Sequence, residues 1–322
     1  MKKLFLLILM ELVIAMPAAY CYAYSSRIYK LPYNPTIIAT GNGYVFLANY
    51  KRKSVVRINS VNREMSISRH NHRIYGIFIN GGYIFIASGN EKYDIAGMDS
   101  AGNIYGIGGS DASLYEFTDA GKYMRQVKGR LSGILSANIT FTKNDEMWTM
   151  TSYGHILKYG RSRELLETYK IPFATAFGYI AIDKDGDIWI ATDNNTVIEL
   201  NRAGGIINRY NLFSNGQTAE DMTSICTINL KTSKSGNIWI YDPRVILTHA
   251  TEHMSRTGVV SNEKVSYTST GKNILMEMSP AGDIIKKYHI PAVNAPYAMA
   301  IDKSGNVWIA VGNDKLMEII NK

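Results

Sequence analysis

The chain has 322 residues, a formal net charge of +8 and 46% hydrophobic residues, with 22 tyrosines and 27 glycines. It contains two cysteines, Cys21 near the N-terminus and Cys226 in the apolar stretch SICTINL. A disulfide framework is therefore excluded, and Cys226 is expected to be a core thiol. The basic residues form short runs such as YKRKSVVR without interleaved aromatic residues, so nucleic acid is not an expected partner.

Residues 1–23 have the layout of a secretory signal peptide. Lys2 and Lys3 precede the apolar runs LFLLILM and LVIAM, which small residues follow. Cleavage after Ala23 would start the mature chain at Tyr24. The apolar run is too short to span a bilayer, so we expect a periplasmic or secreted protein with no stable membrane insertion after cleavage. Retention of the segment as an uncleaved anchor is the alternative.

One short phrase with an aromatic residue at its centre recurs along the rest of the chain. It recurs at intervals of roughly 40 residues or longer, the size of a four-stranded propeller blade. Apolar side chains alternate or run briefly within each copy, and segments such as DKDG and DKSG are typical of tight hairpins. The sequence therefore predicts an all-β propeller, a single domain over 24–322. The central residues of the six copies are Phe46, Phe85, Trp148, Trp189, Trp239 and Trp308.

The two ends of the predicted ring complement each other. Each well-preserved copy has a fourth strand of the form Tyr-x-Leu/Ile-Pro, as in YKIP and YHIP. The same phrase, RIYKLP, occupies residues 27–32 with no blade before it, and the last copy ends at Lys322 after its third strand. We therefore expect the N-terminal strand to complete the C-terminal blade and close a ring of four-stranded antiparallel blades.

The number of blades depends on the phrase MDSAGNIYGI, which places Tyr105 in the aromatic position soon after Phe85. If this phrase belongs to an insertion, the ring has six blades and the second carries a long loop before its third strand at SLYEF. If it belongs to a blade, the count is seven and the preceding blade lacks two strands. We expect six blades, with long loops near residues 88–112 and 242–273.

Propeller geometry places both long loops on one face of the ring. The connections between second and third strands and those between blades share this face, here called the channel face. The two loops would lie opposite each other across the channel, and extended loops on one face of a repeat scaffold usually mark its binding face. The candidate ligand-binding residues on this face are Asn90, Glu91, Asp193, Asp242, Arg244 and Tyr297.

The order Tyr-Ile-Pro, a strand and then Asp-x-x-Gly-Asn-Val-Trp-Ile resembles the repeat of the virginiamycin B (streptogramin) lyase family and of the wider NHL-type propellers. The resemblance is clearest over 160–213 and 277–322. It implies a propeller fold. For the lyases it also implies histidines in a Pro-His-x-Ile phrase at the start of inner strands, and acidic residues three or four positions beyond the second-strand aromatic.

This chain matches that site pattern only in part. Tyr297 and Gly178 stand where the resemblance implies histidines, whereas Asp193 and Asp242 match the acidic positions. Two carboxylates are suitable ligands for a hard divalent ion, but the expected base for proton abstraction is missing. We therefore expect a relative of the fold without the catalytic histidines of the lyases.

The segment HATEH has the residue order of an inverted zinc-protease motif, with His249, Glu252 and His253. The motif requires a helix that places both histidines on one face, and the sequence offers neither a helix of adequate length nor a third ligand. No cofactor is assigned. The weak candidates for binding a divalent cation are Asp193, Asp242, His249 and His253.

Two functional hypotheses follow from these observations. The favoured one is an exported, noncatalytic propeller, expected to be a monomer, that binds a protein, peptide or glycan on its channel face. The alternative is a metal-dependent lyase or lactonase-like hydrolase with its site at the channel mouth. Extended loops support the first, and the paired carboxylates support the second.

Overall fold

The computed structural model describes residues 25–49, 51–80, 83–88, 93–108, 113–118, 122–127, 139–151, 154–171, 179–192, 196–211, 229–242, 245–249, 266–269, 273–291 and 298–320. These residues form β-strands and turns. Among these described residues, no helix is long and apolar enough to cross a membrane.

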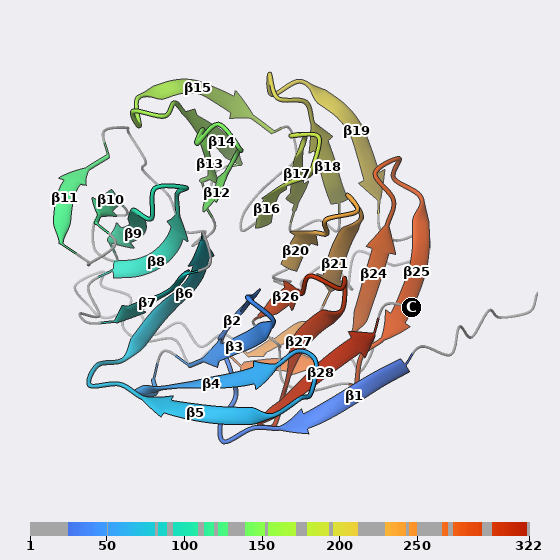
Figure 1. Cartoon of the computed structure of the whole chain (residues 1–322). Helices are drawn as coiled ribbons and strands as arrows, with labels where there is room; N and C mark the ends of the chain where they lie inside the picture. The colour runs from blue at the N-terminus through green and yellow to red at the C-terminus, as the bar shows by residue number, and fades with distance from the viewer. Residues whose placement is uncertain are drawn as a thin grey trace, which may run out of the picture.

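Six antiparallel sheets of four strands form the blades of a ring (Figure 1), which confirms the predicted fold class. The first blade contains β2 (Ile37–Gly41), β3 (Tyr44–Ala48), β4 (Ser54–Asn59) and β5 (Met65–Arg69). The second contains β8 (Tyr93–Met98), β9 (Ile104–Gly108), β10 (Leu114–Phe117) and β11 (Tyr123–Gln126). The third contains β12 (Ile139–Phe141), β13 (Met147–Met150), β14 (His155–Tyr159) and β15 (Leu165–Lys170).

The other three blades follow the same order from the centre outward. The fourth contains β16 (Tyr179–Ile182), β17 (Ile188–Ala191), β18 (Thr196–Leu200) and β19 (Ile206–Asn211). The fifth contains β20 (Asn229–Thr232), β21 (Ile238–Asp242), β24 (Ile274–Met278) and β25 (Ile284–His289). The sixth contains β26 (Met299–Ile301), β27 (Val307–Gly312), β28 (Lys315–Ile320) and β1 (Ser25–Lys30).

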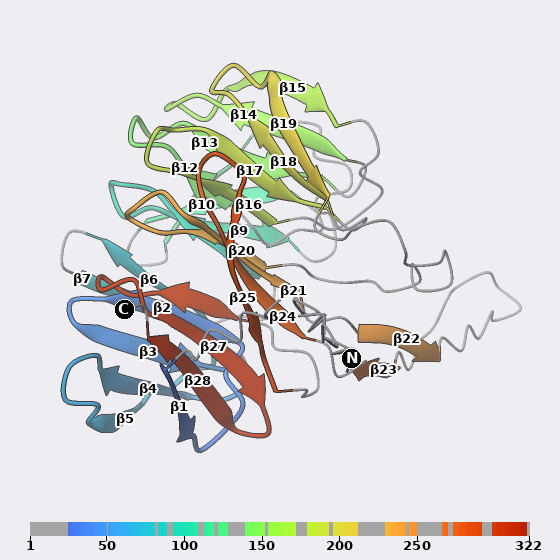
Figure 2. The ribbon, with the colours of Figure 1, turned by 90° about the vertical axis from the view of Figure 1, so that its right-hand side faces the viewer.

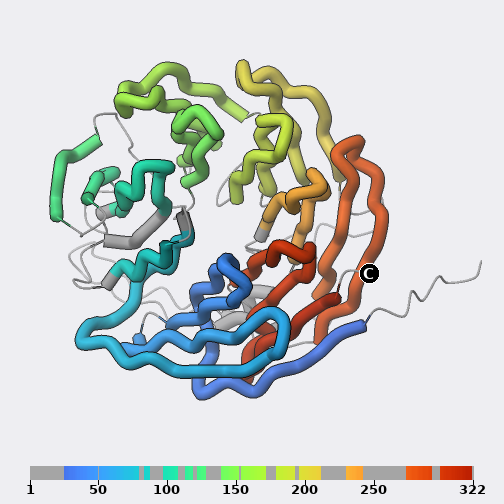
Figure 3. Tube along the Cα trace, in the orientation of Figure 1, coloured from blue at the N-terminus to red at the C-terminus, as the bar shows by residue number. Residues whose placement is uncertain are grey.

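The N-terminal strand closes the ring, as predicted. β1 lies antiparallel to β28 as the outermost strand of the sixth blade, with Ser25 opposite Ile320 and Lys30 opposite Lys315. Just beyond the strand, the Leu31 amide donates a hydrogen bond of 2.7 Å to the Asp314 carbonyl. Figure 3 shows this blue N-terminal segment running along the red C-terminal strands. The pairing covers the edge of β28 that the C-terminal blade would otherwise expose.

A two-stranded sheet has its own place in the ring between the first and second blades. It consists of β6 (Ile74–Asn80) and β7 (Tyr83–Ser88), and β6 contacts β2 on one side and β8 on the other. The prediction of a long loop near 88–112 is therefore wrong, because β8 and β9 fall in that range and belong to a complete blade. Six blades are complete, as predicted, but the phrase MDSAGNIYGI lies in one of them and the hairpin before it has two strands, which is the arrangement that the alternative described. Tyr105, rather than Phe85, has the aromatic position of that blade.

Residues 93–108 form a hairpin instead of the predicted loop because hydrogen bonds to a side chain hold the turn between β8 and β9. The Asp99 carboxylate accepts hydrogen bonds from the amides of Ala101 at 3.0 Å and Asn103 at 2.8 Å, and Gly102 has φ 91°. These contacts make β8 and β9 a stable hairpin that pairs onward with β10. The second predicted loop, 242–273, contains a hairpin as well, formed by β22 (Val245–His249) and β23 (Ser266–Ser269).

The repeated phrase is explained by one hydrogen-bonded turn that places the tryptophan. In the fourth blade, the Asp183 carboxylate accepts hydrogen bonds from the amides of Asp185 and Asp187 and, at 2.9 Å, from the indole nitrogen of Trp189. Asp302 makes the equivalent 3.0 Å contact with Trp308. Each indole is fully buried between its own blade and a neighbour, so the turn fixes the packing of blade against blade.

Candidate binding site

Most of the predicted site residues lie outside the described part of the chain. The two exceptions can be placed on the backbone. Asp242 is the last residue of β21 and lies opposite Ile274, and His249 is the last residue of β22 and lies opposite Ser266. Those that fall outside the described residues are Asn90, Glu91, Asp193, Arg244, Tyr297 and His253.

Two predictions about the channel face need correction. The two long loops cannot face each other, because the first of them forms β8 and β9 of the second blade. His249 ends a β-strand, so it does not lie on the helix that the zinc-protease motif requires. The second predicted loop, 242–273, does project from the ring. Figure 2 shows its strands β22 and β23 beyond the ends of β21 and β24. Asp242 therefore stands where this hairpin leaves the ring.

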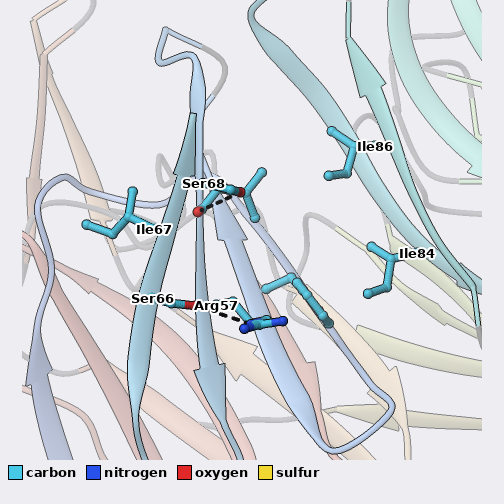
Figure 4. A pocket seen from close by; sticks show the side chains of 8 residues that line it. Arg57, Ser66, Ile67, Ser68, Ile84 and Ile86 are labelled. Carbon is cyan, nitrogen blue, oxygen red and sulfur yellow. Dashed lines mark hydrogen bonds between the residues drawn. The ribbon is translucent and has the colours of Figure 1, made fainter. Parts of the chain in front are cut away.

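The described residues form a recess between the first blade and the two-stranded sheet. It has a volume of about 410 Å³. Ile84 and Ile86 of β7 form one side, and Phe46, Val55 and Arg57 form the other. Figure 4 shows the two isoleucines facing Arg57 and Ser66 across it. In the described part of the chain, the sheet of β6 and β7 has two strands, so the third and fourth strands that cover this surface between complete blades are not present at the recess.

The two-stranded sheet has an outer edge at β7. Within the described ranges, β7 pairs with β6 alone. Tyr83 and Ile84 on this strand are 73% and 40% exposed. An unpaired strand presents a row of amide and carbonyl groups that can pair with another extended segment. Within the described residues, the recess therefore combines an apolar surface with a strand that is paired along one edge.

Arg57 gives the recess a positive charge, whereas the equivalent position of most blades is a glutamate. The third-strand residue opposite the second-strand aromatic is Arg57 in the first blade, and its partner is Phe46. Its Nε donates a 3.2 Å hydrogen bond to Ser66, and its guanidinium lies 4.7 Å from the centre of the Tyr44 ring. Among the described residues it contacts no carboxylate. The equivalent residues are Glu116, Glu199, Glu277 and Glu318 in four blades and Lys158 in the third.

The glutamate at this position of the sixth blade binds a residue of the neighbouring blade. Glu318 is fully buried and accepts hydrogen bonds from the Tyr29 hydroxyl at 2.7 Å and from Arg63 at 2.5 Å. Arg63 lies in the turn between β4 and β5 of the first blade, so this ion pair joins two blades. Burial and the contact with Glu318 both raise the pKa of Tyr29. In the sixth blade the charge at this third-strand position is thus matched by a charge from the next blade, whereas in the second blade Glu116 is matched by Arg125 of its own blade.

A second inter-blade network holds the second and third blades together. Arg163, from the turn between β14 and β15, donates hydrogen bonds to Asp99 at 2.8 Å and to the Tyr105 hydroxyl at 2.6 Å. Burial alone would raise the pKa of the Asp99 carboxyl, but hydrogen bonds from Asn103, Tyr105 and Arg163 outweigh it and hold this pKa below its usual value. Asp99 is fully engaged in structure.

Lys231 is a further candidate site residue, which no sequence motif marks. It lies on β20, the innermost strand of the fifth blade, opposite Trp239. The residues opposite the tryptophan in the fourth and sixth blades are Ala181 and Ala300. Burial lowers the pKa of the Lys231 amine. Aligning the first strands of the repeats would have found it, because a lysine replaces a small residue there.

Comparisons with known proteins support the fold. A family model described as "Two component regulator propeller" matches residues 172–194. A solved structure of streptogramin B lyase has a TM-score of 0.67 and 14% sequence identity, and the match covers 92% of this chain and 97% of that one. A catalytically inactive virginiamycin B lyase from Staphylococcus aureus, solved with quinupristin, has a TM-score of 0.50 and 13% identity, and the match covers 93% and 100%. No curated protein matches the sequence. The predicted resemblance to streptogramin lyases is thus confirmed for the propeller fold.

Proposed function

We propose that the chain is an exported, noncatalytic β-propeller that binds a protein, peptide or glycan. The lining of the recess is the observation that supports this proposal. Phe46, Val55, Ile84 and Ile86 supply apolar surface, and Arg57 with two serines supplies hydrogen-bond donors. Such side chains bind and orient a ligand. General acid–base catalysis needs a group that titrates near the working pH, and this lining contains no carboxylate, histidine or cysteine.

The channel face is a second candidate surface for the same function. The hairpin of β22 and β23 extends this face beside the end of β21 (Figure 2). Extended connections on a rigid scaffold commonly carry ligand contacts. Asp242 lies at the base of the hairpin, and Asp193, Arg244 and Tyr297, which lie outside the described residues, are further proposed ligand contacts.

Selection from libraries tests the binding function without naming the ligand in advance. The mature chain from Tyr24 would be screened against displayed peptides and a glycan array, and each enriched ligand would be titrated by calorimetry. We expect saturable binding that one of two substitutions weakens at least tenfold: Ile86→Asp in the recess or Asp242→Ala on the channel face. Ile207→Asp, on the exposed outer strand β19, is the matched control. Absence of any saturable ligand from both libraries would contradict the proposal.

The alternative function is a metal-dependent lyase or lactonase-like hydrolase. Its motivation is the pair Asp193 and Asp242, with His249 or His253 as a further ligand. It requires a stoichiometric divalent ion that Asp193→Ala or Asp242→Ala releases, and a metal-dependent reaction on lactones or cyclic esters. Metal analysis of the purified mature chain, with melting temperatures before and after chelation, separates this function from simple binding.

A further inference from the structure

We infer that an extended peptide segment of a partner protein completes the two-stranded sheet, adding to β7 as a third strand and placing a carboxylate on Arg57. The inference rests on the proposed binding function and names the partner's chemistry: two apolar side chains at alternate positions, followed by an acidic residue. Strand addition to an exposed sheet edge is a known mode of peptide recognition, in which backbone hydrogen bonds give affinity and side-chain pockets give specificity.

The first argument is the incomplete strand count. All six blades have four strands, whereas β6 and β7 form a sheet of two. Only the four residues 89–92 separate β7 from β8, which is too short for two further strands. Among the described residues, the outer edge of β7 therefore has no third strand of the kind that all six blades have. A strand from another molecule fits that place.

The fourth blade shows what a third strand contributes at this interface. In β18, Ile198 lies opposite Ile190 and Leu200 lies opposite Ile188. All four of these side chains belong to the cluster that buries Trp148 of the preceding blade. Two apolar residues at alternate positions thus cover the aromatic residue of the neighbouring blade.

The two-stranded sheet has half of this arrangement. Ile77 lies opposite Ile86 and Ile79 opposite Ile84, and Ile77, Ile79 and Ile86 pack with Phe46 of the first blade. The recess occupies the position where a third strand would place its two apolar side chains. By the register of the fourth blade, the first of these would lie opposite Ile86 and the second opposite Ile84.

The second argument is charge. Glu318 is held by Arg63 from the turn that follows the third strand of the next blade. At the equivalent position of the first blade the charge is reversed, because Arg57 replaces the glutamate. In the part of the chain that the structure describes, the neighbouring sheet has no third strand or following turn. A partner segment that supplies a third strand and the turn after it would place a residue against Arg57, just as the turn of the first blade places Arg63 against Glu318. Its matching residue is therefore acidic and lies a few residues after the second apolar one.

The shape of the recess favours a peptide segment over a second copy of this chain. The recess lies between two complete blades, and their outermost strands β5 and β11 extend farther from the ring centre than β7 (Figure 1). If two copies of this chain paired through β7, the β7 edge of each copy would lie set back between two blades. The outer strands of these blades would collide before the two edges could pair. A single extended segment meets no such obstacle.

A peptide taken from this chain provides the probe. It has the sequence of residues 196–204, TVIELNRAG, with glutamate in place of Gly204, and a matched peptide has lysine there. Binding of the fluorescently labelled peptides to the mature chain would be measured by polarisation. We expect the glutamate peptide to bind about two- to fivefold more tightly than the lysine peptide, the range for an exposed ion pair. Arg57→Glu should reverse this preference.

Substitutions in β7 test the docking position. Ile86→Asp should weaken binding of the glutamate peptide at least about tenfold, because it places a charge against apolar surface. Ile84→Asp, at a side chain that is 40% exposed, serves if Ile86→Asp does not fold. Ile207→Asp on β19 is the control and should leave affinity unchanged.

Four outcomes would overturn the inference. They are no saturable binding of either peptide, an unchanged charge preference in Arg57→Glu, full binding by both β7 variants, and a dimer of the mature chain that Ile86→Asp dissociates, which would make a second copy the occupant. A fifth outcome, blocking of the peptide by a chain that retains residues 1–23, would also overturn the inference, because it would identify the chain's own N-terminal segment as the occupant. If Asp242→Ala weakens binding of a library ligand and Ile86→Asp does not, the proposed binding function stands and this inference fails.

Discussion

Replacing Asp183 with alanine should destabilise the propeller much more than replacing Thr142, which has the same place in the third blade. Asp183 accepts hydrogen bonds from two turn amides at 2.9 and 3.0 Å and from the Trp189 indole at 2.9 Å. The amides can turn to water, but the indole nitrogen is buried and would be left without a partner, which costs about 1–3 kcal/mol. With about 0.5–1.5 kcal/mol for the amides, we expect Asp183→Ala to lower the free energy of unfolding by about 2–4 kcal/mol.

Thr142 provides the control because its tryptophan already lacks this contact. The Thr142 hydroxyl accepts from the amides of Asn144 at 3.3 Å and Glu146 at 3.1 Å, and the buried indole nitrogen of Trp148 has no hydrogen-bond partner among the described residues. Thr142→Ala should therefore cost about 1 kcal/mol or less. Urea unfolding followed by tryptophan fluorescence measures both variants. Equal losses would refute the assignment of the difference to the indole contact.

Four further outcomes are expected. Gly43 and Gly204 share φ 77°, but a Cβ on Gly43 meets nothing within 4 Å whereas one on Gly204 meets a tyrosine ring, so Gly204→Ala should cost at least about 1 kcal/mol more than Gly43→Ala in urea unfolding. The folded-state pKa of Asp99 lies below its unfolded value, so its contribution to stability is present above pH ~4 and is lost as pH falls through the folded pKa; Asp99→Asn should flatten that part of the stability profile. Metal analysis should find no stoichiometric ion and a melt insensitive to chelator, whereas a bound ion lost in Asp242→Ala would favour the enzyme. N-terminal sequencing of exported protein should begin at Tyr24, and a retained N-terminus would contradict signal cleavage.

Local sequence patterns were sufficient to predict most of the fold. The aromatic positions, the Asp-Gly turns and the alternation of apolar residues are local features, and they correctly predicted hairpins, blades and the all-β class. Ring closure was also predictable, because RIYKLP repeats a fourth-strand phrase where no blade precedes it and β1 does pair with β28. The site could not be predicted in the same way, because Arg57 resembles an ordinary strand residue until its spatial neighbours are known.

The sequence by itself determined which segments form hairpins and where the chain closes its ring, because turn chemistry and side-chain periodicity depend on residues close together in the chain. The tertiary structure alone decided which hairpin becomes a complete blade. Phe85 and Tyr105 stand in similar phrases, but the third strand SLYEF pairs with the hairpin of Tyr105 and leaves that of Phe85 with two strands. The recess and the charge of Arg57, which no carboxylate among the described residues matches, follow from that choice, because strand pairing and blade contact join residues that are distant in sequence.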